Sequence, residues 1–214
     1  MTTAVADKGV DEVLTELLKE TEGVIQVVDP SSRAINELIQ VAIEMDEPPR
    51  IQLLSEEQRL KELMEDFLIA GKAADLIEQN ALSMRTMATR AGNELVITDA
   101  QVTAIISAGT AVAALTTEED DFVAAASEYY EDVWEDAEAF TLRTPPLSRV
   151  RETLGEEIGS DVEADFSAVL DSLETARGNG NGLDEVTISL LVAAKNEELL
   201  YDISKWGEDV GIAS

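Results

Sequence analysis

The chain has 214 residues and a net charge of −30, from 45 acidic and 15 basic side chains, and its 45% hydrophobic content is enough for a folded core. It contains no cysteine, which excludes a disulfide framework, a thiol nucleophile and a zinc finger. It contains no histidine, which excludes a Ser-His-Asp triad, histidine acid–base catalysis and nearly all zinc chemistry.

The first 80 residues alternate between helical and extended patterns. Apolar residues at helical spacing predict helices over 10–18 and 32–45, and further helices between 55 and 77. Two β-branched or apolar runs, 24–28 and 51–54, predict strands between these helices. The alternation predicts a layered α/β arrangement.

From residue 82 the apolar residues change from helical spacing to the alternation that is typical of strands. Residues 82–86 alternate, and short β-prone runs follow at 95–97, 102–106 and 111–115, separated by turn residues. This pattern predicts a strand and a meander. Together with the preceding helices and strands, it predicts an α/β domain with a mixed sheet over residues 1–140.

The stretch that follows predicts a long helix. Thr116 and Glu119 have the spacing of a capping box, with carboxylates in the first turn. An apolar stripe then repeats at helical spacing, made of Phe122, Ala126, Tyr129, Val133, Ala137 and Phe140. We interpret this stripe as packing against the sheet, not as a cofactor surface.

Residues 141–182 are expected to be a linker with connecting helices. The double proline at 145–146 marks the domain boundary, and helices are expected near 148–154 and 161–177. Glycines at 178–182 are typical of a hinge, because no strand precedes them and no Lys-Ser/Thr follows. The second helix carries an apolar stripe that would suit a dimer seam, made of Val162, Phe166, Val169, Leu170 and Leu173.

Residues 183–214 predict two helices followed by a tight turn. Asp184 and Asn196 are candidate N-caps for the two helices, and Gly211 is placed to end the second one. Ser214 would be a suitable N-cap for a helix that follows.

The same stretch matches the first half of a helix-turn-helix pattern, in which a small residue allows close packing and a glycine makes the turn. The matching residues, in order, are Ile203, Trp206, Gly207, Val210, Gly211, Ile212 and Ser214. The alternative is a plain helical hairpin that ends in a glycine cap.

Two segments carry a resemblance to a known family. KNEELLYDISKWGEDVGIAS and the upstream EEDDFVAAASEYYEDVWEDAEAF resemble the haloarchaeal transcriptional regulators of the TbsP family, named as suppressors of the sugar-responsive regulator TrmB. The resemblance implies that 183–214 are the first two helices of a C-terminal winged helix-turn-helix, with a recognition helix expected just after Ser214. On this expectation the chain is truncated, and its own DNA binding would be weak.

The α/β arrangement of the first 140 residues resembles the phospholipase D-like sensor domains that are fused to archaeal regulators. The catalytic form of that fold needs a His-Lys-Asp set, and this chain has no histidine. The resemblance therefore implies a non-catalytic scaffold without a cofactor. The protein is not expected to be an enzyme.

Acidic residues are the remaining candidates for a site. The carboxylate clusters at 118–121 and 131–138 lack the spacing of a calcium loop, so a solvated surface is favoured over a metal site. Asp29 and Asp99 each follow a predicted strand, where α/β domains often bind small ligands. We therefore expect a metabolite pocket at Asp29 and Asp99.

The acidity is spread along the whole chain and would be screened in concentrated salt, which favours the cytoplasm of a halophilic archaeon. An acidic surface for a basic partner protein is the alternative. The N-terminus has no secretory signal pattern, and the longest apolar runs, such as 187–194, are too short to span a membrane. A cytoplasmic location is expected.

These observations predict a DNA-binding transcriptional regulator, and the family resemblance points to central carbon metabolism. It is expected to act as a homodimer on double-stranded promoter DNA, with a metabolite as a possible effector. Residues 183–214 hold two lysines and seven carboxylates, so phosphate contacts would have to come from elsewhere. The alternative is a small-molecule sensor or protein-interaction module without direct DNA binding.

Overall fold

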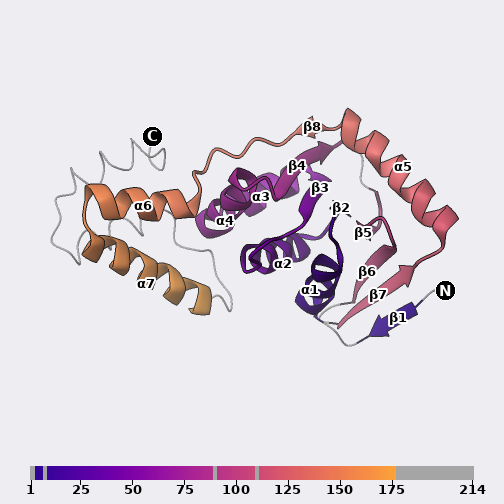
Figure 1. The fold of residues 1–214 in the computed structure, drawn as a ribbon, viewed down its shortest axis with the longest axis horizontal. Coiled ribbons are helices and arrows are strands. Elements are labelled where there is room, and N and C mark those ends of the chain that lie inside the picture. Colours follow the sequence, from indigo (N-terminus) through magenta and orange to yellow (C-terminus); the bar gives the residue numbers. More distant parts are fainter. Residues whose placement is uncertain (1–2, 7–8, 89–90, 109–110, 177–214) are drawn as a thin grey trace. The chain divides into compact units, whose positions relative to one another are not determined.

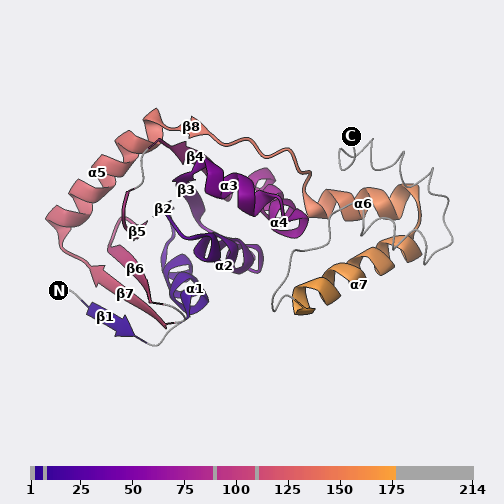
Figure 2. The same cartoon turned by 180° about the vertical axis from the view of Figure 1, so that it is seen from behind.

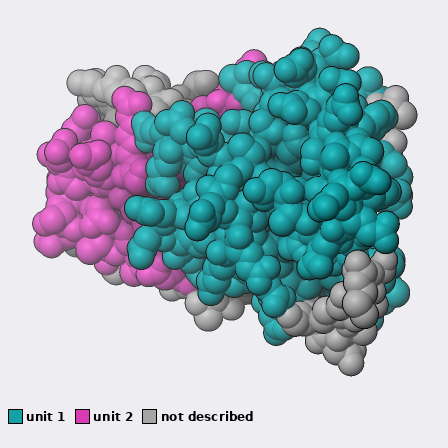
Figure 3. All heavy atoms as spheres, turned by 45° about the vertical axis from the view of Figure 1, so that its right-hand side comes forward, with its two compact units in different colours: residues 1–63, 76–141 teal, residues 64–75, 142–214 magenta. Residues whose placement is uncertain are grey.

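A computed structural model describes residues 3–6, 9–88, 91–108 and 111–176. These residues fall into two compact units, which Figure 3 shows in different colours. The first unit comprises residues 1–63 and 76–141, and the second comprises 64–75 and 142–214. None of the described helices is long and apolar enough to cross a membrane.

The first unit is built on a mixed sheet, as the sequence predicts. Within the described residues the sheet has eight strands in the order β1-β7-β6-β5-β2-β3-β4-β8. Strands β2, β3 and β4 are parallel, and the pairs on either side of them are antiparallel. The strands are β1 (Thr3–Ala6), β2 (Val24–Val28), β3 (Arg50–Glu56), β4 (Leu82–Met87), β5 (Glu94–Ile97), β6 (Val102–Ala108), β7 (Ala111–Thr117) and β8 (Glu138–Ala139).

Helices cover both faces of this sheet. Figures 1 and 2 show α1 (Val10–Glu20) and α2 (Ser32–Ile43) on one side of the strands and α5 (Asp120–Asp136) on the other. Ser31 caps α2, because its hydroxyl accepts a hydrogen bond from the Ala34 N–H at 3.2 Å. A further helix, α3 (Glu57–Met64), starts directly at the end of β3.

The helix α5 packs on the sheet with a face that agrees only in part with the predicted stripe, since Ala126, Val133 and Ala137 of that stripe pack against the buried cluster. Val123 and Trp134 are buried against the strands, whereas Phe122 and Tyr129 are 54% and 61% exposed. The expected stripe is therefore wrong at its two exposed aromatic residues. The helix also ends at Asp136, so it does not include Phe140.

The expected capping box of α5 does not form. The helix begins after Glu119, whose side chain makes no capping hydrogen bond. Thr116 belongs to β7, where its hydroxyl lies 2.9 Å from the hydroxyl of Thr103 on β6. Thr116 therefore serves the sheet rather than the helix, because the strand extends one residue beyond it.

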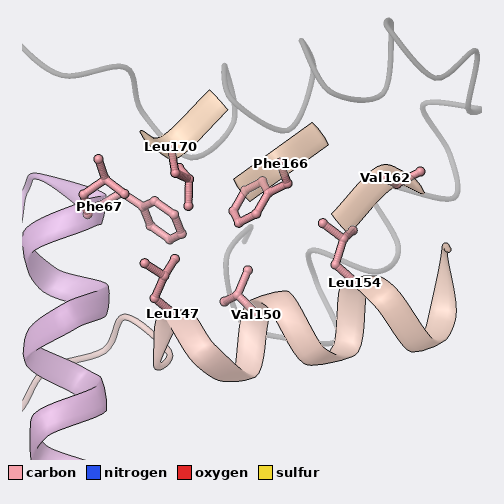
Figure 4. Close-up of a cluster of buried hydrophobic side chains, with 8 residues drawn as sticks. Phe67, Leu147, Val150, Leu154, Val162, Phe166 and Leu170 are labelled. Atoms are coloured by element: carbon pink, nitrogen blue, oxygen red, sulfur yellow. The ribbon is translucent and has the colours of Figure 1, made fainter. Parts of the chain in front are cut away.

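The second unit has a hydrophobic core of its own, made by α4 (Phe67–Glu78), α6 (Leu147–Glu157) and α7 (Ser160–Ala176). Figure 4 shows side chains of α6 projecting towards those of α4 and α7. Gly71 allows the close approach of α4 and α6, since a Cβ atom there would lie 3.2 Å from the Cβ atom of Leu147. The buried residues are Phe67, Leu68, Leu147, Val150, Leu154, Val162, Phe166 and Leu170.

This core uses the stripe that the sequence suggested as a dimer seam. Val162, Phe166 and Leu170 are 3%, 3% and 0% exposed within a single chain. The suggestion is wrong for these three residues, because they already pack against α4 and α6.

Candidate functional site

The carboxyl ends of the three parallel strands meet at one edge of the sheet. Asp29 follows β2, Glu57 follows β3 and Ala88 follows β4. In α/β sheets this edge is the usual place for a ligand site, because the loops that leave the strands converge there. Two hollows lie at this edge, one beside Asp29 and the other beside Ala88.

Asp29 is held in an unusual backbone conformation. Its φ of 47° is in the left-handed region, which Asp tolerates better than most residues, and its N–H donates to the Leu54 carbonyl at 2.8 Å. This conformation turns the chain sharply at the end of β2. The Asp29 side chain, which is 2% exposed, accepts a hydrogen bond from the Gly92 N–H at 3.3 Å.

Arg59 of α3 is the cationic partner of Asp29. Its Nη1 lies 2.7 Å from Asp29 Oδ1, and the same nitrogen donates to the Pro30 carbonyl at 2.8 Å and to the Ser55 hydroxyl at 3.3 Å. The Arg59 side chain is 13% exposed. The ion pair therefore links the end of β2 to α3 and is largely shielded from solvent.

The smaller hollow, with a volume of about 270 Å³, opens beside this ion pair. Ser31 at the start of α2 donates to the Glu94 carboxylate at 3.5 Å. Burial raises the pKa of Glu94, while Ser31 and Arg59 act in the opposite direction. The residues that line this smaller hollow are Asp29, Ser31, Ser32, Arg59, Gly92, Asn93 and Glu94.

Replacing Glu94 with glutamine is expected to remove a pH dependence of stability. Because the pKa of Glu94 is raised above 4.5, the folded protein holds more protons than the unfolded chain as the pH passes from 4.5 to the raised pKa. The contribution is full below 4.5 and is lost as the pH rises through this window. Urea unfolding of Glu94→Gln at a series of pH values should show a flatter profile than the parent.

The amide of the Glu94→Gln variant can still accept a hydrogen bond from Ser31, so the substitution tests the charge. Glu128→Gln, at an exposed position on α5, is the matched control and is expected to keep the parent profile. If Glu94→Gln followed the parent profile as well, the burial of Glu94 would not be the source of the pH dependence.

The larger hollow, with a volume of about 730 Å³, lies between the end of β4 and the last turns of α5. The rings of Tyr129 and Tyr130 form one corner of it, with centroids 4.9 Å apart and planes at 87°. Burial raises the pKa of Tyr130, and the neighbouring Tyr129 and Asp29 add to the effect. The lining residues are Glu57, Thr86, Met87, Ala88, Ala91, Tyr129, Tyr130, Val133, Asp136, Ala137 and Glu138.

The structure does not bring Asp29 and Asp99 together. Asp99 is exposed in the turn between β5 and β6. Because β5 runs antiparallel to β2, the end of β5 lies towards the start of β2, whereas Asp29 lies at the end of β2. Only Asp29 lines a hollow at the carboxyl edge. A ligand pocket at Asp29 stays a prediction, without Asp99.

The start of the second unit's α6 is capped by a residue far away in the sequence. The Asp75 carboxylate of α4 accepts hydrogen bonds from the Ser148 N–H, at 3.1 and 3.3 Å to its two oxygens, and from the Ser148 hydroxyl. Asp75 is 7% exposed. Pro146, the residue before the helix, makes no side-chain cap. Asp75 therefore supplies the capping interaction that the local sequence lacks.

Replacing Asp75 with alanine is expected to lower the free energy of unfolding by about 1–2 kcal/mol, because the first turn of α6 loses its acceptor in a buried setting. Urea unfolding measures this loss. Glu78→Ala, at an exposed position on the same helix, is the control and should change stability by less than about 0.5 kcal/mol. Equal effects at the two positions would contradict the capping role.

The residues of the predicted helix-turn-helix lie outside the described part of the chain. They are Ile203, Trp206, Gly207, Val210, Gly211, Ile212 and Ser214. Their role stays a prediction from the sequence.

Comparison with protein families assigns both parts of the chain. Residues 2–145 match the N-terminal domain of TbsP-like transcriptional regulators, and residues 146–214 match the C-terminal helix-turn-helix domain of the same regulators. Among curated proteins no match is found. The two matched domains define the class: this is a transcriptional regulator with an α/β domain and a C-terminal helix-turn-helix domain. The chain belongs to the TbsP-like family.

Solved structures show distant similarity. TrmBL2, described as an archaeal chromatin protein with a novel mode of DNA binding, aligns at a TM-score of 0.47 and 18% identity over 64% of this chain and 53% of its own. This chain thus spans about half of TrmBL2.

Two further solved structures give comparable values. Nuc, a phospholipase D family member from Salmonella typhimurium, aligns at a TM-score of 0.44 and 9% identity, over 65% of this chain and 99% of its own. NucT from Helicobacter pylori aligns at 0.43 and 10% identity, over 65% of this chain and 100% of its own.

Proposed function

We propose that this protein regulates promoters of central carbon metabolism in a halophilic archaeon, as a cytoplasmic, non-catalytic homodimer. In this proposal residues 1–140 are the sensor and dimerisation domain, 141–182 connect the domains, and 183–214 hold the start of the winged helix-turn-helix. The family assignment supports the regulator role, and the net charge of −30 supports a salt-rich cytoplasm.

The observation that carries the sensor role is the position of α3 and α4 in the chain. Arg59 of α3 contacts Asp29 at the candidate ligand site, and only Glu65 and Asp66 separate α3 from α4. The next helix, α4, packs in one core with α6 and α7, which lie in the helix-turn-helix domain of the family. Ligand binding that moves α3 would therefore act on a helix that the second core depends on.

The acidity of the chain sets the conditions for a test. Concentrated salt weakens the contribution of released counterions to DNA binding, so base contacts and apolar fit must supply more of the affinity. An electrophoretic shift assay at molar KCl should use the complete product of the gene and promoter fragments of sugar and gluconeogenic genes. A shift with a subset of these fragments is expected.

A folded protein that shifts none of the fragments would contradict the proposal. Circular dichroism at the same salt concentration shows whether the protein is folded. A folded protein that binds a small ligand but no fragment would favour the alternative, a sensor or interaction module without direct DNA binding.

A further inference from the structure

The larger hollow at the carboxyl edge, here called the tyrosine cavity, has the size of a small-molecule site. Its volume of about 730 Å³ lies within the usual range of ligand pockets. The perpendicular rings of Tyr129 and Tyr130 form two walls of a corner. The two rings are in edge-to-face contact. Because the face of an aromatic ring attracts cations, the ring faces that line the corner favour an ammonium group there.

The charged side chains around the tyrosine cavity also favour a cationic ligand. Three carboxylates line the cavity, on Glu57, Asp136 and Glu138, of which Glu57 is already paired with Lys61 of the same helix. None of the lining residues is cationic within the part of the chain that the structure describes. A phosphorylated ligand would meet the carboxylates of Asp136 and Glu138 without a cationic lining residue to compensate them. A cation would be attracted by both of these carboxylates.

The arginines on neighbouring elements are engaged elsewhere. Arg59 pairs with Asp29 at 2.7 Å. Arg85 of β4 lies over the Trp134 ring, with 4.8 Å from its Cζ to the ring centroid, and donates to the Trp134 carbonyl at 2.5 Å. Both guanidinium groups therefore hold the fold together, and neither has to be displaced when a cation enters the tyrosine cavity.

Part of the lining is apolar. Met87 of β4 and Val133 of α5 contribute aliphatic surface beside the two rings. In concentrated KCl a bare cation would compete poorly with potassium, since Coulomb attraction is strongly screened. A ligand with an apolar body keeps the contribution of its buried hydrocarbon surface at any salt concentration.

We propose that the tyrosine cavity binds an organic ammonium ion with an apolar body, and that such an ion is the effector of this regulator. Its ammonium group lies in the Tyr129–Tyr130 corner, close to the carboxylate of Asp136, and its hydrocarbon part contacts Met87 and Val133. The effector role rests on the proposed function, whereas binding itself does not.

The test is isothermal titration calorimetry in molar KCl with choline and with dimethylbutanol, its neutral isostere, in which carbon replaces nitrogen. The two probes have the same shape, so only the charge separates them. Choline is expected to bind at least about tenfold more tightly than the alcohol, and glucose 6-phosphate is expected not to bind.

Single substitutions test whether choline binds in the tyrosine cavity. Tyr129→Ala is expected to weaken choline binding by about fivefold, because one wall of the corner is lost. Asp136→Asn should weaken it by about threefold, because it removes one of the two lining carboxylates, Asp136 and Glu138, that attract the cation. Phe122→Ala is the matched control, since Phe122 is also an exposed aromatic residue of α5 but does not line the cavity, and it should leave binding unchanged.

Equal affinities for choline and the alcohol, or binding of glucose 6-phosphate in place of choline, would overturn the assignment of a cation. An unchanged affinity in Tyr129→Ala would overturn the location. Because the titration contains no DNA, its failure leaves the shift assay of the proposed function unaffected. Choline binding with no effect on a positive shift assay would support the site and overturn the effector role.

Discussion

Replacing Arg59 with leucine is expected to lower the free energy of unfolding by about 3–5 kcal/mol, one of the two largest effects of a single substitution that we predict. The Asp29 side chain is 2% exposed, and its carboxylate lies 2.7 Å from the guanidinium. Removing the cation leaves a buried negative charge without its ion pair, which costs far more than an exposed pair contributes. Urea unfolding monitored by circular dichroism measures the difference.

Two further variants show whether the stability loss of Arg59→Leu comes from the unpaired buried charge or from lost side-chain packing. In the double variant Asp29→Asn with Arg59→Leu the buried charge is absent, and asparagine tolerates the φ of 47° at this position. We expect it to recover part of the stability that Arg59→Leu loses. Lys61→Leu is the surface control, since Lys61 pairs with Glu57 on the same helix at 58% and 60% exposure and should change stability by less than about 1 kcal/mol.

If the double variant were no more stable than Arg59→Leu, the buried carboxylate would not be the cause of the loss. The aliphatic part of Arg59 would then account for it through packing. The same comparison tests the link between the ligand edge and α3 on which the sensor role depends.

Much of the α/β unit was predictable from local patterns. The strands at 24–28 and 51–54 and the meander after residue 82 appear at the expected places, because β-branched runs and turn residues determine them over short distances. Asp29 was predictable as a candidate for the same reason, since it directly follows a strand. The short edge strands β1 and β8 were missed, because each depends on pairing with a partner far away in sequence.

The partners of Asp29 could not be found from the sequence. Arg59 is 30 residues away and reaches Asp29 only because β2 and β3 are adjacent and parallel. Glu94 comes close because β5 pairs antiparallel with β2, a topology that periodicity does not reveal. The apolar spacing predicted helices between 55 and 77, but nothing in that pattern marks Arg59 as an ion-pair partner.

The sequence also did not predict which core α4 packs into. Its apolar residues predict a helix, but not the core that it joins. Phe67 packs with Leu147 and Leu170, and Asp75 caps α6 across 73 residues of sequence. Sequence patterns give the apolar face of a helix, whereas the partner of that face is decided by tertiary packing. For the same reason, the stripe of α7 was interpreted as a surface between two chains.

Replacing Phe166 with alanine is expected to lower the stability of the second unit by about 3–5 kcal/mol. Phe166 is 3% exposed and lies in the core that α4, α6 and α7 share, where the lost ring would leave a cavity. Phe166→Leu keeps most of the volume and should lose less than about 1.5 kcal/mol. Phe122→Ala, the same change at 54% exposure, should lose less than about 0.5 kcal/mol.

The concentration dependence of this loss distinguishes a core within one chain from a dimer seam. If Phe166 packs within its own chain, the stability difference between parent and Phe166→Ala is independent of protein concentration. If it lies in a seam that the substitution disrupts, mass action stabilises only the parent dimer as the protein concentration rises, so the difference grows. Urea unfolding at protein concentrations that differ a hundredfold therefore decides between them. A difference that grows with concentration would mean that α7 faces a second chain.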